Sequence, residues 1–231
     1  MRTVTIGSFV DFVKHSEFFD LLVEHTVFRG QPVQGNLLPS IARADPSVDT
    51  TSREEQTLEQ LRMLGASFLP TSAETDLDLL VRSQHFGLKT RLLDWTSNSL
   101  AALWFACADK APGDVFVYAL EVDDLLVKSG VYNENPFKTA KTRAFLPRLN
   151  NARVIAQHGW FTLHRYSKKA KRYVPLERNP ETKKHLHELR IPVGKREEML
   201  KALDRHGVST RTLFPDIGGL CQYLNWKHDA T

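Results

Sequence analysis

The chain has 231 residues, which fits one large domain, and its 42% hydrophobic content is enough for a sizeable core. No window approaches 18 consecutive apolar residues, the N-terminus lacks the features of a secretory signal, and two distant cysteines form no metal spacing, so a membrane-spanning or disulfide-rich secreted protein is not expected. The net charge of +4 hides an asymmetry, because residues 1–130 carry 11 Lys and Arg against 18 Asp and Glu, whereas residues 131–231 carry 20 against 9.

Charge and cysteine usage both bear on the setting in which the protein acts. The basic C-terminal half suits binding of a polyanion, while acidic and basic segments that face one another or water are the alternative; charge alone leaves the two at even odds. Cys107 and Cys221 indicate reduced, buried thiols, and we expect a cytoplasmic protein.

Helical signals dominate the first half of the chain. The patterns predict helices over residues 8–14, 52–68 and 76–86, with Ser8 as the first N-cap, a capping box from Ser52 to Glu55, and Gly87 as a C-cap.

The first strong strand signal surrounds Arg29. Val27 and Phe28 are strand formers, and Gly30 with Pro32 ends the strand. A guanidinium at a strand end can face a cleft and grip a phosphate or carboxylate with two parallel N–H groups. A structural ion pair with an acidic residue of the same half is the alternative, and position alone leaves the two equal.

The rest of the chain is arranged around the stretch 83–106. It turns at Gly87, stays polar up to Thr96, and continues into the most apolar helix, 97–108, for which Thr96 or Ser97 is the expected N-cap. A loop before a capped helix rarely needs Gln, His, Thr, Arg, Asp, Trp and Thr together. The stretch therefore predicts a recognition site, with a plain loop and capped helix as the alternative.

Strands gather after residue 114. The patterns predict strands over 114–122 and 186–193, two short strands within 151–164, and helices over 195–206 and from Asp216 to about 226; residues 129–150 resemble a mobile flap. Because no run of alternating strands and helices is visible, we predict one mixed α+β domain over 1–231, with a helical N-terminal part and a strand-rich centre.

A dense basic run follows the predicted central strands. Five of the eight residues in 165–172 are cations, and Tyr166 and Tyr173 bracket the run. It is either a solvated loop or a contact with a nucleic-acid backbone. In the second case the contacting residues would be Lys168, Lys169, Lys171 and Arg172.

Three motifs together resemble the FRG domain, a family named for its Phe-Arg-Gly signature. They are Phe28-Arg29-Gly30, the run from Gln84 to Thr96, and residues 153–162, with a weaker tail at 213–219, so that the resemblance covers about 24–225. The order of these motifs is similar to the layout of ADP-ribosyltransferases: an aromatic-Arg-Gly strand, a polar Ser/Thr element, then a strand with an acid or a glutamine. The resemblance implies a split sheet of the ADP-ribosyltransferase kind.

The resemblance also implies that NAD is the substrate. Arg29 would bind its pyrophosphate or ribose, Asp94 is the nearest carboxylate in the motifs, and Gln157 stands where such transferases usually have Glu; these three are the expected catalytic residues. Glutamine can bind a ribose hydroxyl but cannot act as a general base. The expected NAD-binding residues are Arg29, Gly30, Gln84, His85, Thr90, Arg91, Trp95 and Thr96, with Trp95 available for stacking.

Three functions follow from these observations. The first is an NAD-using, ADP-ribosyltransferase-like enzyme that modifies a nucleic-acid or protein target, as a bacterial or phage toxin or defence effector. The second is a nucleic-acid-binding or regulatory module without turnover. The third is a nuclease or other hydrolase in which His85, Asp94 and His158 converge. The nine scattered histidines and the absence of a ligand motif favour no metal.

Overall fold

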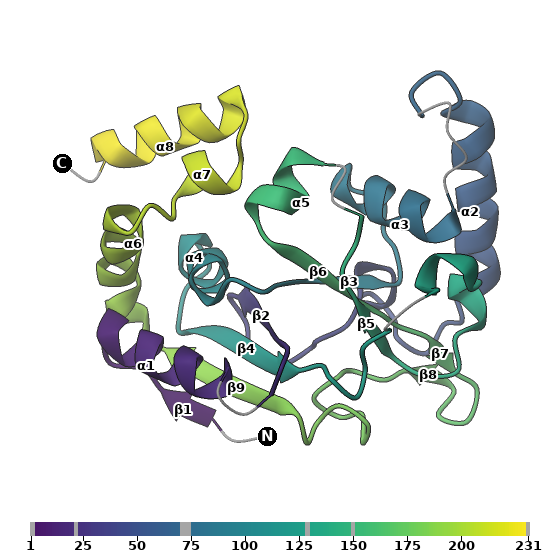
Figure 1. The fold of residues 1–231 in the computed structure, drawn as a ribbon, viewed down its shortest axis with the longest axis horizontal. Helices are drawn as coiled ribbons and strands as arrows, with labels where there is room; N and C mark the ends of the chain where they lie inside the picture. Colours follow the sequence, from purple (N-terminus) through teal and green to yellow (C-terminus); the bar gives the residue numbers. More distant parts are fainter. Residues whose placement is uncertain (1–2, 21–22, 70–74, 128–129, 149–150, 230–231) are drawn as a thin grey trace.

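A mixed seven-stranded sheet is the framework of the protein (Figure 1). The computed structural model describes residues 3–20, 23–69, 75–127, 130–148 and 151–229. In spatial order the strands are β1 (Thr3–Thr5), β9 (Leu186–Ile191), β4 (Val115–Glu121), β2 (Thr26–Gln31), β3 (Leu92–Thr96), β6 (Gly159–Leu163) and β5 (Arg143–Phe145). A separate two-stranded hairpin consists of β7 (Tyr166–Ser167) and β8 (Arg172–Tyr173).

The helices surround this sheet. They are α1 (Phe9–Asp20), α2 (Thr51–Leu64), α3 (Asp76–His85), α4 (Ser99–Ala108), α5 (Ala152–Ala156), α6 (Arg196–Arg205), α7 (Thr210–Leu213) and α8 (Ile217–Asp229), with short 3-10 turns η1 (Ser40–Ala42), η2 (Val131–Asn133), η3 (Pro136–Lys138) and η4 (Val193–Lys195). Only β1 and β9 pair in parallel among the named strands, and the α+β class is confirmed. Within the described part of the chain, no helix is long and apolar enough to cross a membrane.

One half of the sheet is covered by α1, α4 and α6 (Figure 1). Alternate residues of β4 point into this layer, where Val117 and Ala119 meet Phe12 of α1 and Leu203 of α6. The helix α4 lies directly on β2, and this contact is very close at Gly30. A Cβ atom at Gly30 would stand 1.8 Å from the carbonyl oxygen of Ala102, so only glycine lets this helix and strand approach so closely.

The other half of the sheet, β3, β6 and β5, packs against α2 and α3. Leu58 of α2 and the apolar residues of α3 join Leu92 and Phe161 in one buried cluster; those of α3 are Leu77, Leu79, Leu80 and Val81. The remaining residues of β4, such as Tyr118, point to the opposite face of the sheet and belong to a third buried cluster. Leu37 and Leu176, from connecting segments, pack in the same cluster. The two helical layers therefore pack on different strands, and the junction between β2 and β3 lies at the border between the two layers.

That junction is the weakest pairing between neighbouring long strands. β2 pairs with β4 at six positions, from Thr26 to Gln31, but it pairs with β3 at one position only, Phe28 with Thr96. An unbroken antiparallel ladder would next place Gly30 opposite Asp94, and the two strands have parted by then. The sheet is therefore continuous but opens between β2 and β3 beyond Phe28.

Several sequence predictions hold, and others are wrong for identifiable reasons. Ser8 begins α1 by accepting the N–H of Asp11 at 3.2 Å, although the helix runs further than 14. Gly87 and Gly207 follow α3 and α6 with positive φ, as expected of glycine. The N-cap of α4 is Asn98, not Thr96 or Ser97, because its Oδ1 accepts the N–H groups of Leu100 and Ala101.

Two segments were assigned the wrong element. Within 151–164 the first predicted strand is the helix α5, since Asn151 caps it by accepting the N–H of Arg153 at 2.8 Å. Within 129–150, where a flap was expected, β5 joins the sheet and Phe145 stacks on Phe161 at 5.8 Å; residues 129, 149 and 150 lie outside the described residues. In both cases tertiary packing overrode a weak local pattern.

The predicted thiol environment is half right. Both cysteines are free, and burial raises the pKa of the Cys107 thiol to about 12, while nearby Arg196 opposes the shift. Cys221 is exposed on α8, contrary to the expectation of a buried thiol. It is exposed because α8 contacts the rest of the protein along one narrow side only, where Gly219 is buried.

A buried ion pair joins α2 to the start of β3. The carboxylate of Glu54 accepts the Arg91 backbone N–H at 2.8 Å and its Nε at 2.7 Å, and both side chains are almost fully buried. The predicted capping box from Ser52 to Glu55 is therefore wrong, because α2 already begins after Thr50 and Glu54 points inward. The Arg91 guanidinium also lies 4.6 Å over the ring of Phe137.

Gly30→Ala is expected to lower the free energy of unfolding by about 3 kcal/mol, since α4 must move away from β2 to make room for a methyl group. The measurement is urea denaturation of the purified protein. Gly194→Ala is the matched control, because a Cβ there meets nothing within 4 Å. Equal stability of the two variants would show that α4 does not press on Gly30.

Glu54→Gln is expected to cost about 3–5 kcal/mol, because it leaves the Arg91 guanidinium buried without an opposite charge. Glu55→Gln, on the exposed side of the same helix, should change the unfolding free energy by less than about 0.5 kcal/mol. A thermal unfolding scan of both variants beside the parent protein tests this. A small, equal effect in both would mean that water reaches the pair.

Candidate functional site

The side chain of Arg29 occupies the opening between β2 and β3. Its Nη1 donates to the backbone carbonyl of Asp94 at 2.8 Å, and its Nε donates to Oε1 of Gln31 at 3.3 Å. The Asp94 carboxylate lies 3.9 Å from the same Nη1. The guanidinium thus takes up a carbonyl that the broken ladder leaves free, and it is the link between the two strands where backbone pairing stops.

Asp94 is held by a short chain of hydrogen bonds. Nε2 of Gln84 donates to Oδ1 of Asp94 at 2.7 Å, the Thr90 hydroxyl donates to Oε1 of Gln84, and that hydroxyl accepts the Leu92 N–H at 3.1 Å. The Asp94 side chain remains 60% exposed. The carboxylate is therefore oriented by protein groups on one side and open to a ligand on the other.

Arg29, Gln84 and Asp94 line a hollow of about 350 Å³, here called the Arg29 pocket, whereas Thr90 is fully buried and does not line it. Its charged members are the cations Arg29, Arg43 and Lys89 and the single carboxylate of Asp94. The remaining lining residues are Ser40, Gln84, Gly87, Leu88 and Leu92. A small hollow with three cations and one anion is suited to bind an anion such as a phosphate.

The environment of Arg29 affects two pKa values. Burial lowers the pKa of Arg29 to about 10, the Asp94 carboxylate opposes this, and Arg43 adds to it; the guanidinium remains charged at neutral pH. Behind it, burial together with the charges of Arg29 and Arg91 lowers the pKa of His164 to about 3. His164 is therefore neutral and adds no charge to that of Arg29.

His85 lies beside the pocket at the end of α3. Burial and the charge of Arg153 lower its pKa, while the Asp94 carboxylate raises it, so the imidazole is neutral at physiological pH. Its Nε2 is buried and has no hydrogen-bond partner among the described residues. His85 thus interacts electrostatically with Asp94 and with Arg153 of α5, although it does not line the Arg29 pocket.

Several expected binding residues point away from the pocket. Arg91 is enclosed with Glu54, and Trp95 is buried with its Nε1 donating to the Thr162 hydroxyl at 3.0 Å, so Trp95 has no free face for stacking. The Thr96 hydroxyl donates to the carbonyl of Gln157 at 2.7 Å. These side chains build the framework behind the site, and Gly30 contributes only its close approach to α4.

Gln157 belongs to a different contact. It ends α5, and its Nε2 donates to the carbonyl of Leu213 at 3.1 Å. Nearby, Arg153 pairs with Asp216 at 2.6 Å. Asp216 in turn accepts the Gly219 N–H at 2.8 Å and so caps α8, as predicted. Gln157 does not line the Arg29 pocket; it holds the third motif against the tail motif.

The predicted nucleic-acid-binding residues lie on an exposed hairpin. Lys168, Lys169, Lys171 and Arg172 are all exposed, between and within β7 and β8. The flanking rings of Tyr166 and Tyr173 meet at 5.7 Å and pack on the segment around η1. The basic run is therefore an ordered, solvent-facing element, and η1 behind it supplies Ser40 to the Arg29 pocket.

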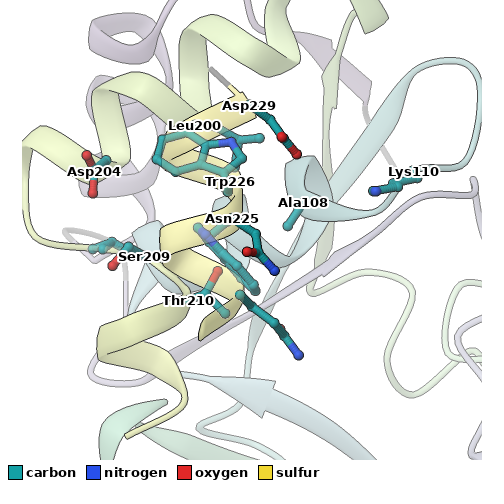
Figure 2. A pocket seen from close by; sticks show the side chains of 12 residues that line it. Ala108, Lys110, Leu200, Asp204, Ser209, Thr210, Asn225, Trp226 and Asp229 are labelled. Carbon is teal, nitrogen blue, oxygen red and sulfur yellow. The ribbon is translucent and has the colours of Figure 1, made fainter. Parts of the chain in front are cut away.

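A second hollow, of about 490 Å³, lies between α4, α6 and α8 (Figure 2). Trp226 and Asn225 of α8 face Ala108 of α4 and Leu200 of α6 across it. It contains none of the residues expected from the sequence. Its lining mixes indole, carboxylate and amide groups without a cluster of one charge.

The hydrolase arrangement is not assembled. His158 is exposed, with a positive φ of 49°, and no contact joins it to Asp94 or His85 among the described residues. In the same part of the chain no group of three or more His, Cys, Asp or Glu side chains is placed to hold a metal ion. Sequence reasoning missed Arg43 and Lys89 of the pocket lining, whose only signal was charge near the motifs.

Comparison with known proteins gives a match over part of the chain. No curated protein and no solved structure matches the chain. The family model of the FRG domain matches residues 24–114, which run from just before β2 to the start of β4. The match includes the opening between β2 and β3 and all the residues that line the Arg29 pocket, whereas residues 153–162 and 213–219 lie outside it. Residues 24–114 of the chain are therefore similar to the FRG domain.

Proposed function

We propose that this FRG-domain protein binds NAD in the Arg29 pocket and uses it in an ADP-ribosyltransferase-like reaction. The observation that carries the proposal is the pairing of Arg29 with an exposed, oriented carboxylate at the opening of the sheet. The motif order adds the expectation that the anionic ligand is NAD. The pocket volume of about 350 Å³ suits the diphosphate and a neighbouring ribose.

Each group of the pocket has a distinct part in this reaction. Arg29, Arg43 and Lys89 neutralise the diphosphate and set its position, which is the binding and orientation contribution. The bond between nicotinamide and the ribose C1′ then breaks, and its electron pair leaves with the nicotinamide. The positive charge that builds on the sugar is stabilised by the Asp94 carboxylate, as in glycoside cleavage.

The second half of the reaction needs an acceptor. A nucleophile, either water or a group of a macromolecule, bonds to C1′ and releases a proton, which the Asp94 carboxylate can accept. Gln84 keeps that carboxylate in place through its 2.7 Å hydrogen bond. The step needs no contribution from Gln157, whose amide is already bound to Leu213.

Asp94→Asn is expected to lower turnover of NAD about 100-fold or more while leaving NAD binding and thermal stability nearly unchanged, since the side chain is 60% exposed. Nicotinamide release and transfer of labelled ADP-ribose measure turnover, and calorimetry measures binding. Glu59→Gln, an exposed change on α2, is the control.

Arg29→Lys should instead weaken NAD binding, because a single ammonium cannot hold both the Asp94 carbonyl and a phosphate. If the parent protein neither binds NAD nor releases nicotinamide, the enzyme proposal is wrong. Toxicity on expression that Asp94→Asn relieves would extend the proposal to a toxin or phage-defence effector.

Binding of nucleic acid is a second candidate function, and the exposed hairpin favours it. Four exposed cations lie on one ordered element, and no acidic residue lies between Arg165 and Arg172 to neutralise them. This function does not exclude the first, because the hairpin and the Arg29 pocket are joined through η1. The hairpin would then hold a nucleic-acid target of the transferase.

Replacing Lys168, Lys169, Lys171 and Arg172 by Ala is expected to weaken binding of single-stranded nucleic acid and to flatten its salt dependence by about 0.7 per lost phosphate contact in the log–log plot. Fluorescence anisotropy at several salt concentrations measures both. The control replaces the exposed Lys138, Lys141 and Lys183 by Ala. Equal slopes for the two variants would mean that net charge, not the hairpin, attracts the nucleic acid.

A further inference from the structure

An apolar groove runs between the ends of α2 and α3. We call it the Phe68–Phe86 groove; its volume is about 700 Å³ and it is lined by Leu61, Gly65, Phe68, Leu69, Arg82, Ser83, Phe86, Gly87 and Leu88. Phe68 is 87% exposed and Phe86 is 80% exposed. Two phenyl rings left in water at the rim of one groove are a large uncompensated apolar surface, which marks a binding site.

The groove adjoins the Arg29 pocket. Gly87 and Leu88 line both hollows, so the turn after α3 forms the border between them. Gly87 has a φ of 94°, and a Cβ there would meet nothing within 4 Å. Because glycine has no side chain, only backbone atoms form the border at this position. At Gly87, therefore, no side chain separates the apolar groove from the cationic pocket.

The two hollows differ in the chemistry they accept. One presents Arg29, Arg43 and Lys89, and the other presents phenyl and aliphatic surface. Phe86 and Lys89 are three residues apart, so their Cα atoms are at most about 11 Å from one another. A ligand that fills both hollows is anionic at one end and carries a flat apolar group at the other, within the reach of a single nucleotide.

We infer that the Phe68–Phe86 groove receives the planar heteroaromatic base of the nucleotide whose phosphates lie in the Arg29 pocket. This inference rests on the proposed function and adds to it the subsite that selects a nucleotide over a simple phosphate ester. A phenyl ring stacks on any base, because every base has a π-face. The groove therefore supplies affinity for the base, and the cations supply it for the phosphates.

The experiment compares NAD with inorganic pyrophosphate, which has the phosphates but no base. Calorimetry gives the affinity of each ligand for the parent protein and for Phe68→Ala combined with Phe86→Ala. We expect the double variant to bind NAD about tenfold more weakly, which corresponds to about 1.4 kcal/mol, and to bind pyrophosphate as the parent does. Phe18→Ala, which removes a 56% exposed ring on α1, is the matched control and should change neither affinity.

Lys89→Ala tests the phosphate subsite separately. It should weaken the binding of both NAD and pyrophosphate, since both carry the phosphates. The Lys89 side chain is exposed, so folding is retained. If the double variant binds NAD as tightly as the parent protein, the groove does not hold the base and the inference is wrong, while the proposed function stands. A groove that receives a peptide or a lipid chain gives that same result. If the parent protein binds neither ligand, the proposed function fails and this inference fails with it.

Discussion

The hydrogen bond from Arg29 to the carbonyl of Asp94 is the interaction on which the site depends. β2 and β3 pair at Phe28 and Thr96 and then part, which leaves backbone groups of β3 without a strand partner. The guanidinium bonds to one of these groups across the opening. The same contact keeps a partly buried cation next to an exposed carboxylate, so the opening in the sheet is also the place where charge is concentrated.

The three residues of the Phe-Arg-Gly signature face two sides of one strand. Phe28 packs with the helical layer of α1, α4 and α6, and Gly30 lets α4 approach β2. Arg29 points to the opposite side, into the opening. The strand alternates by its geometry, so a short motif can combine two packing residues with one functional residue. The motif therefore specifies a helix contact and a charged site at once.

The second motif has the same mixture of tasks. Gln84 and Asp94 line the pocket, and the buried Thr90 supports them through its hydrogen bond to Gln84. Arg91 and Trp95, between them and beside them, face the interior, where Glu54 and Thr162 satisfy their N–H groups. A buried polar group needs such a partner, because an unsatisfied one costs free energy. Polar residues in one run thus divide between ligand-facing and framework roles.

Much of the site region could be predicted from local signals. The α+β class, the strand that carries Arg29, the glycine after α3 and the capping of α8 by Asp216 follow from residue preferences that act over a few positions. The charge of the hairpin formed by β7 and β8 was also visible, because five cations in eight residues need no fold to be recognised.

The sequence by itself determined the FRG signature, the fold class and the chemical types of the site residues. Only the tertiary structure decided that Arg29 and Asp94 meet and that Arg91 and Trp95 are buried. It also decided that Gln157 bonds to α7 and does not line the pocket. It also brought in Arg43 and Lys89. The physical reason is that a polar side chain finds its partner through strand register and helix packing, and partners far apart in the chain leave no trace in the local pattern.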